Sequence, residues 1–111
     1  MTHAQTNFGA PPEHWLKIDW KVAGQPDRAV VWGHVFNDFG LAARDVSLLV
    51  EGLDASGRVV TRAVAHVPFV VTPGTHGYFE TVVGPAAGYR VSVYSYTWMH
   101  DDDFRPFRRR F

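Results

Sequence analysis

Apolar and polar residues alternate with a period of two along much of this chain, which is the pattern of half-buried β-strands. The clearest case runs from Trp15 to Val22, where every second residue is apolar and most of the others are charged. One face of this predicted strand carries Leu16, Ile18, Trp20 and Val22. The turn composition of Gly24–Asp27 separates it from the next strand.

The stretch Arg28–Asp38 is apolar on both of its faces and predicts a strand at the centre of the fold. Alternation places Val31, Gly33 and Val35 on one face. The other face would carry Val30, Trp32, His34 and Phe36. The segment Asn37–Gly40 that follows has the composition of a turn.

The rest of the chain predicts further short strands separated by turns. They lie at Asp45–Leu53, Arg58–Val67, His76–Val83 and Tyr89–Met99, with a shorter extended piece at Phe69–Thr72. Asp54 and Gly57 suit the first and the left-handed positions of a hairpin turn. No stretch shows the helical period of about 3.6 residues. Six or seven short strands predict an all-β fold: an immunoglobulin-like antiparallel β-sandwich of about seven strands or, as the alternative, a small antiparallel β-barrel.

The length of 111 residues fits a single domain. We expect residues 1–13 to form a flexible leader, residues 14–100 the sandwich and residues 101–111 a charged and aromatic tail. Lys and Arg together number 11, as do Asp and Glu, so net charge gives no argument for nucleic acid as a partner. The chain has no cysteine, which excludes disulfides, thiolate catalysis and zinc sites with cysteine ligands.

No segment has the features of a targeting or membrane-spanning sequence. Met1–Pro12 lacks the basic and apolar regions of a signal peptide, and no run approaches about 18 apolar residues. As the sequence stands we expect a cytoplasmic protein, or an extracytoplasmic one if the sequence was trimmed from a longer chain.

Several of these segments, taken in order, resemble the FxLYD-type domains of bacteria. The matching pieces are Gly33–Asn37 (G-x-V-x-N), Val46–Val50, Asp54–Val60 (D-x-x-G-x-V-V), Pro73-Gly74 and Phe79. The naming motif corresponds to Val50–Asp54, of which Asp54 matches. The resemblance implies an immunoglobulin-like or fibronectin-like sandwich. It also implies an accessory or interaction module, often extracytoplasmic, without a shared active site.

Aromatic residues on two predicted strands suggest a binding face. Strict alternation would put Tyr94, Tyr96 and Trp98 on one side of their strand, opposite Val91 and Val93. If the valines of both strands point into the core, Trp32, His34 and Phe36 extend the same face. An exposed aromatic patch of several hundred Å² marks a partner surface. The other interpretation is that these rings are buried in the core.

The sequence has no recognisable catalytic or metal motif. Its six histidines are scattered, and only His100 stands beside a run of carboxylates, Asp101–Asp103, which we interpret as a solvated turn. No serine sits in a nucleophile motif with a base at the expected spacing. We therefore expect no enzyme activity, no metal site and no cofactor.

The tail interleaves basic and aromatic residues. Its four arginines are Arg105, Arg108, Arg109 and Arg110. Such a tail can bind nucleic acid or an anionic membrane surface, but the adjacent Asp101–Asp103 opposes its charge. We favour the interpretation that the tail is a flexible terminus, or a strap that covers part of the sandwich. The expected function is a non-catalytic binding or interaction module whose partner is another protein or a second copy. The alternative is a module that binds carbohydrate or a small hydrophobic ligand on the same aromatic face.

Overall fold

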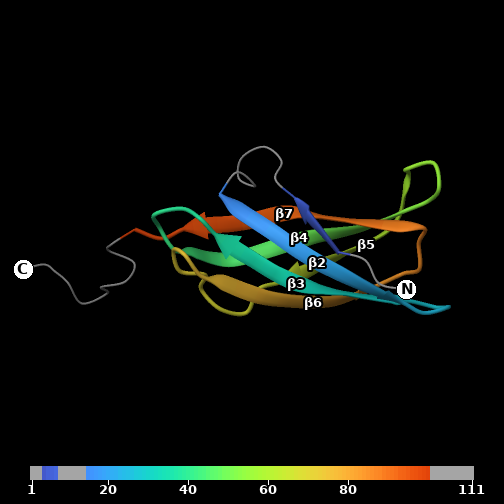
Figure 1. Cartoon of the computed structure of the whole chain (residues 1–111), viewed down its shortest axis with the longest axis horizontal. Coiled ribbons are helices and arrows are strands. Elements are labelled where there is room, and N and C mark those ends of the chain that lie inside the picture. Colours follow the sequence, from blue (N-terminus) through green and yellow to red (C-terminus); the bar gives the residue numbers. More distant parts are fainter. Residues whose placement is uncertain (1–3, 8–14, 101–111) are drawn as a thin grey trace, which may run out of the picture.

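The computed structural model describes residues 4–7 and 15–100, which form two antiparallel β-sheets packed face to face (Figure 1). The strands are β1 (Ala4–Asn7), β2 (Leu16–Gly24), β3 (Ala29–Asn37), β4 (Ala43–Leu53), β5 (Val59–His66), β6 (His76–Val83) and β7 (Gly88–Trp98). The first sheet has the order β1-β2-β3-β6 and the second the order β5-β4-β7. The described residues contain no helix. The predicted all-β sandwich is confirmed, with two separate sheets rather than one closed sheet.

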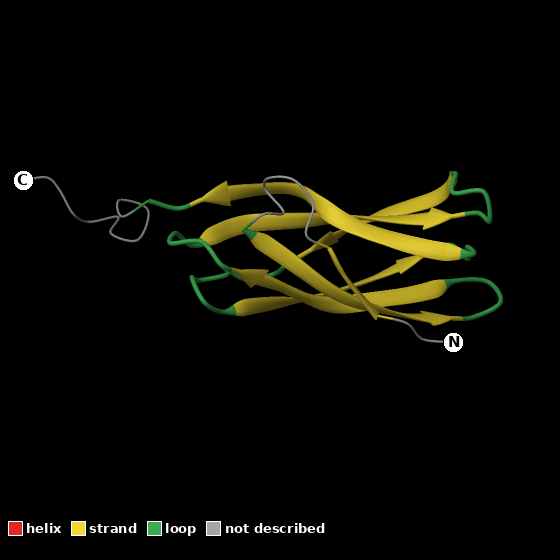
Figure 2. Ribbon diagram, turned by 45° about the horizontal axis from the view of Figure 1, so that its top comes forward, coloured by secondary structure: helices red, strands yellow, loops and turns green. Residues whose placement is uncertain are grey.

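The chain stays in one sheet at its hairpins and changes sheet elsewhere. Hairpins join β2 to β3 and β4 to β5, whereas the connections β3–β4, β5–β6 and β6–β7 cross between layers. Figure 2 shows the loops gathered at the two ends of the layers. Across the core, β2 lies near β7 and β6 lies near β5.

Six of the predicted strands correspond to β2–β7. The seventh predicted strand, Phe69–Thr72, is not formed as a strand, and β1 is a strand that was not predicted. Phe69–Thr72 contributes only an isolated bridge between Val71 and Ala43, because the prolines on both sides prevent a longer ladder. The additional strand is β1, which lies within the segment expected to be a leader and pairs with Ile18–Lys21 of β2. The other leader residues and the tail 101–111 lie outside the described residues.

The core is formed by the inward-facing residues of both sheets. From the first sheet it takes Leu16, Ile18, Trp20, Val22, Ala29, Val31, Val35, Phe79 and Val83. The second sheet contributes mainly Val46, Leu48, Val50, Ala65 and Val91. Burying side chains of this size stabilises a fold by about 1.5–3 kcal/mol each, so the core fixes which face of each strand points inward.

Gly33 allows β2 and β3 to approach closely at the middle of the first sheet. It pairs with Trp20 in the ladder, and a Cβ atom at this position would meet the carbonyl oxygen of Asp19 and lie 2.7 Å from Trp20 Cα. Because both neighbours are backbone atoms, no rotation of a nearby side chain could make room for a side chain at position 33. This requirement explains the glycine in the otherwise bulky strand β3.

Asn37 holds together the loops at one end of the sandwich. Its side-chain Nδ2 donates hydrogen bonds to the carbonyl oxygens of Leu41 (2.8 Å) and Val71 (2.9 Å), and Oδ1 accepts one from the Phe39 amide (2.8 Å). Its backbone also pairs with Gly74 and Thr75. Asn37 is 2% exposed, so the residue predicted to begin a turn is a buried polar junction.

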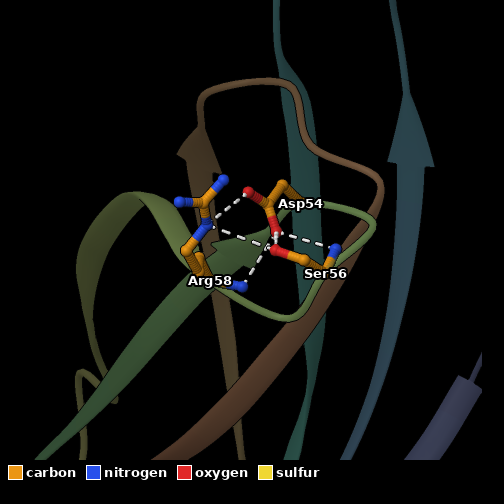
Figure 3. A network of polar contacts seen from close by, with 3 residues as sticks. All are labelled: Asp54, Ser56 and Arg58. Carbon is orange, nitrogen blue, oxygen red and sulfur yellow. Dashed lines mark hydrogen bonds and ion pairs between the residues drawn. The ribbon is translucent and has the colours of Figure 1, made fainter.

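The β4–β5 hairpin turn is organised by Asp54, as the sequence predicted (Figure 3). Asp54 Oδ1 accepts hydrogen bonds from the backbone amides of Ser56 and Arg58, both at 2.9 Å, and from the Ser56 hydroxyl at 2.7 Å. Gly57 takes the left-handed conformation with φ 91°. The Ser56 hydroxyl, followed by the Arg58 amide, holds the pKa of Asp54 below its ordinary value.

Candidate binding face

The outward surface of β2, β3 and β6 carries aligned side chains, and we call it the outer face. Val31 and Val35 are buried, so the alternating residues of β3 point away from the core. The ladders β2–β3 and β3–β6 set these residues in rows across the sheet. The three rows are Lys21–Trp32–Glu80, Asp19–His34–Tyr78 and Lys17–Phe36–His76.

The middle of the outer face is a cluster of rings around His34. The ring centroid of His34 lies 4.7 Å from that of His76, in an edge-on arrangement, and 5.7 Å from that of Tyr78. Phe36 lies 5.4 Å from His76. Phe36 is 39% exposed and Tyr78 is 45% exposed, so the cluster is open to solvent. Val82, on the same strand as Tyr78, extends the apolar surface.

Charged groups border the rings on both sides. The β2 column reads Lys17, Asp19 and Lys21, and the β6 column reads His76, Tyr78 and Glu80. The Tyr78 hydroxyl donates a hydrogen bond of 2.8 Å to Glu80 Oε1, and this bond is the main reason that the pKa of Tyr78 is raised. The outer face is therefore an aromatic patch on β3 and β6, bordered by the charged column of β2 on one side and by Glu80 on the other.

A shallow hollow lies between β2 and β3 within the outer face. Its lining residues are Asp19, Trp20, Lys21, Trp32, Gly33 and His34. The hollow brings one carboxylate and one ammonium group next to an indole and an imidazole ring. The two rings can stack on a flat apolar surface of a ligand, and the two charged groups can hydrogen-bond to hydroxyls at the edge of that ligand.

The predicted site residues fall into two groups that the fold separates. Trp32, His34 and Phe36 lie on the outer face, as their alternation with buried valines required. Tyr94, Tyr96 and Trp98 lie on β7, in the other sheet, whose outward side faces the opposite direction. The single aromatic face expected from the sequence is therefore not formed.

Two β-bulges explain why the three aromatic residues of β7 do not share a side. The ladder of β4 and β7 steps from Arg44–Thr97 to Ser47–Ser95, and then to Leu48–Val93. The first step adds a residue on β4 near Asp45, whose φ is 54°, and the second adds Tyr94 on β7. Alternation shifts by one residue at Tyr94, which leaves it 62% exposed.

After this shift Tyr96 and Trp98 pack against the core. Their ring centroids lie 5.1 Å apart, and Trp98 lies 4.5 Å from Phe39, which in turn lies 5.0 Å from Trp15. These four aromatic residues form a row at one end of the sandwich. For Tyr96 and Trp98, the interpretation as core residues is the correct one.

Sequence reasoning missed His76 and Tyr78 as members of the outer face. Alternation within the predicted strand His76–Val83 does place both on one side. What the sequence does not show locally is that this strand pairs with β3, about 40 residues earlier, and brings both residues beside His34.

The structure gives less support to the other candidate sites. Among the residues that the structure describes, no group of three or more His, Cys, Asp or Glu is placed to hold a metal ion, and no helix is long and apolar enough to cross a membrane. The arginines of the tail and Asp101–Asp103 lie outside the described residues. Ser47 Oγ lies 2.9 Å from His66 Nδ1, but Ser47 is buried, so we interpret this contact as structural.

No protein-family model matches this chain, and neither its sequence nor its structure has a significant match among curated proteins or solved structures. The resemblance to FxLYD-type domains stays a prediction.

Proposed function

We propose that this protein is a non-catalytic binding module that contacts a partner protein through the outer face of its first sheet. The observation that carries the proposal is the exposed ring cluster of His34, Phe36, His76 and Tyr78, with Trp32 beside it. The other side of the same sheet is already packed in the core, so nothing in the described sandwich covers these rings.

The composition of the outer face is that of an interaction surface. Aromatic residues are enriched at the centres of protein interfaces, with polar and charged residues around them. The outer face has this arrangement, with Trp32, His34 and Phe36 in the middle column. The outward side of the second sheet differs, because its exposed apolar residues are separated by Glu51, Arg62 and Arg90. Apolar residues scattered singly on a surface are ordinary.

The experiment is site-specific photo-cross-linking in cells that express the full chain. A photoreactive amino acid replaces Tyr78 in one variant and Tyr94 in a matched control on the other sheet, and mass spectrometry identifies the adducts. The proposal predicts a defined protein adduct from position 78 that is absent from position 94. A second substitution, Trp32→Ala, should reduce the adduct. Equal labelling from both positions, or no adduct from position 78, would contradict it.

A second candidate function is carbohydrate binding, which the hollow beside Trp32 and His34 favours. A sugar ring stacks on an aromatic face while its hydroxyls hydrogen-bond to groups such as Asp19 and Lys21. Titration of the protein with a panel of soluble oligosaccharides, followed by tryptophan fluorescence, tests this candidate. A saturable change that Trp32→Phe weakens and Tyr94→Ala preserves supports it. An unchanged spectrum across the panel counts against it.

A further inference from the structure

We propose that the partner of the outer face is a second copy of this chain, bound about a twofold axis that runs parallel to β3. This inference rests on the proposed function and names its partner. In such an arrangement the outer faces of the two copies lie against each other, and the same residues contribute from both sides.

The charges of the outer face carry the argument. The β2 column presents a positive, a negative and a positive group in Lys17, Asp19 and Lys21. The β6 column, on the other side of β3, ends with the negative Glu80 in the same row as Lys21. The left and right sides of each row therefore differ in charge, and the rows themselves are not alike.

A twofold axis parallel to β3 turns each row onto itself in reverse order. The β2 column of one copy then lies over the β6 column of the other. Lys21 meets the second copy's Glu80, and Asp19 meets the second copy's Tyr78, which is uncharged. Trp32, His34 and Phe36 meet their own counterparts at the centre. Opposite charges face each other, which favours and orients the association.

A twofold axis perpendicular to the strands gives the opposite result. It places the β2 column of one copy over the β2 column of the other, with its direction reversed. Asp19 would then face Asp19 of the second copy, and Lys17 would face its Lys21. Like charges brought together in an interface are unfavourable. The charge pattern of the outer face therefore selects the axis parallel to β3.

The size of the outer face sets the strength expected of this dimer. Three strands at about 4.8 Å spacing and eight residues at about 3.3 Å give a footprint on the order of 400 Å² per copy. A standard interface takes about 800 Å² from each partner. We therefore expect a weak dimer with a dissociation constant of roughly 10 μM to 1 mM.

The experiment is sedimentation equilibrium of the full chain from about 10 μM to 1 mM, a range that covers the expected dissociation constant. The wild-type chain should dimerise within it. Lys21→Glu and Glu80→Lys should each weaken the dimer by roughly tenfold or more, because both cross-copy pairs become repulsive. The control Arg62→Glu inverts the same kind of charge on the second sheet and should leave the dimer unchanged. Urea unfolding curves verify that all variants are folded.

Mixing the two single variants gives the sharpest result. In the mixed dimer, the glutamate at position 21 of one copy faces the lysine at position 80 of the other, and the remaining pair is Glu80 with Lys21. Two variants that are each monomeric should therefore associate when combined. A mixture that stays monomeric, or a wild-type chain that is monomeric at 1 mM, overturns the inference. The proposed function survives that outcome if photo-cross-linking from position 78 captures a different protein.

Discussion

The side chain of Asn37 offers a direct test of what holds one end of the sandwich together. Replacing it with alanine removes the two hydrogen bonds that Nδ2 donates and the one that Oδ1 accepts. The bond to Val71 is buried, but that carbonyl also accepts a hydrogen bond from the Ala43 amide (2.9 Å), so losing the Asn37 donor costs about 1 kcal/mol. The bonds to Leu41 and Phe39 are partly buried and add about 0.5–1 kcal/mol each.

We therefore expect Asn37→Ala to lower the free energy of unfolding by about 2–3 kcal/mol, a substantial share of the roughly 5–15 kcal/mol of an ordinary domain. Urea unfolding monitored by circular dichroism and tryptophan fluorescence measures the loss. The control is Asp38→Ala at the next position. Its carboxylate forms an exposed ion pair with Lys17, with Nζ and Oδ2 2.9 Å apart, and losing that pair should cost less than about 1 kcal/mol.

A second variant, Asn37→Asp, keeps the shape but loses the donor. The new carboxylate would face the carbonyl oxygens of Leu41 and Val71 in a buried place, which raises its pKa in the folded state. A raised pKa means that its stability contribution is present at acid pH and lost as pH rises through the folded value. The variant should thus recover stability on acidification. If Asn37→Ala loses no more than Asp38→Ala, Asn37 does not stabilise this end as argued.

Two further changes test other positions of the fold. Gly33→Ala should prevent folding or lower the urea midpoint sharply, because the new Cβ would lie 2.7 Å from Trp20 Cα, whereas Gly24→Ala, with open space around it, should cost little. Asp54→Ala should lower the melting temperature at pH 7, since the carboxylate that accepts from Ser56 is lost. Because the folded pKa of Asp54 lies below its ordinary 3.8, its stabilisation is present above that value and lost as pH falls through the folded pKa. The difference in melting temperature between wild type and Asp54→Ala should therefore shrink in acid; a constant difference would refute the assignment.

Local patterns predicted most of the fold because each strand carries its own signal. Alternation across Leu16–Val22 identified the buried side of β2, and Asp54 with Gly57 identified a hairpin. The strand β3 was predicted as well, but its two apolar faces left open which side is buried, and the structure buries Val31 and Val35. The strand β1 was missed because Ala4–Asn7 has no apolar alternation, and it forms through backbone pairing with β2.

The candidate site was predicted only in part because it depends on contacts between distant segments. Alternation grouped Trp32, His34 and Phe36 on the face opposite Val31 and Val35, but it left open which of the two faces is buried. Tyr96 and Trp98 were misplaced because a bulge at Tyr94 changes the phase of alternation, and a bulge has no clear sequence signal here. The contribution of β6 required knowledge of which strands pair, which alternation does not provide.

The order of strands in the second sheet has a consequence for how the chain folds. β7 pairs with β4, and the register joins Leu48 to Val93 and Val50 to Val91. While the chain is being synthesised, β4 therefore has an open edge and an incomplete core until the residues up to Trp98 have emerged. Closing such long-range pairings is slow compared with forming local hairpins. Until β7 has emerged, the open edge of β4 is exposed to pairing with other chains, which favours aggregation.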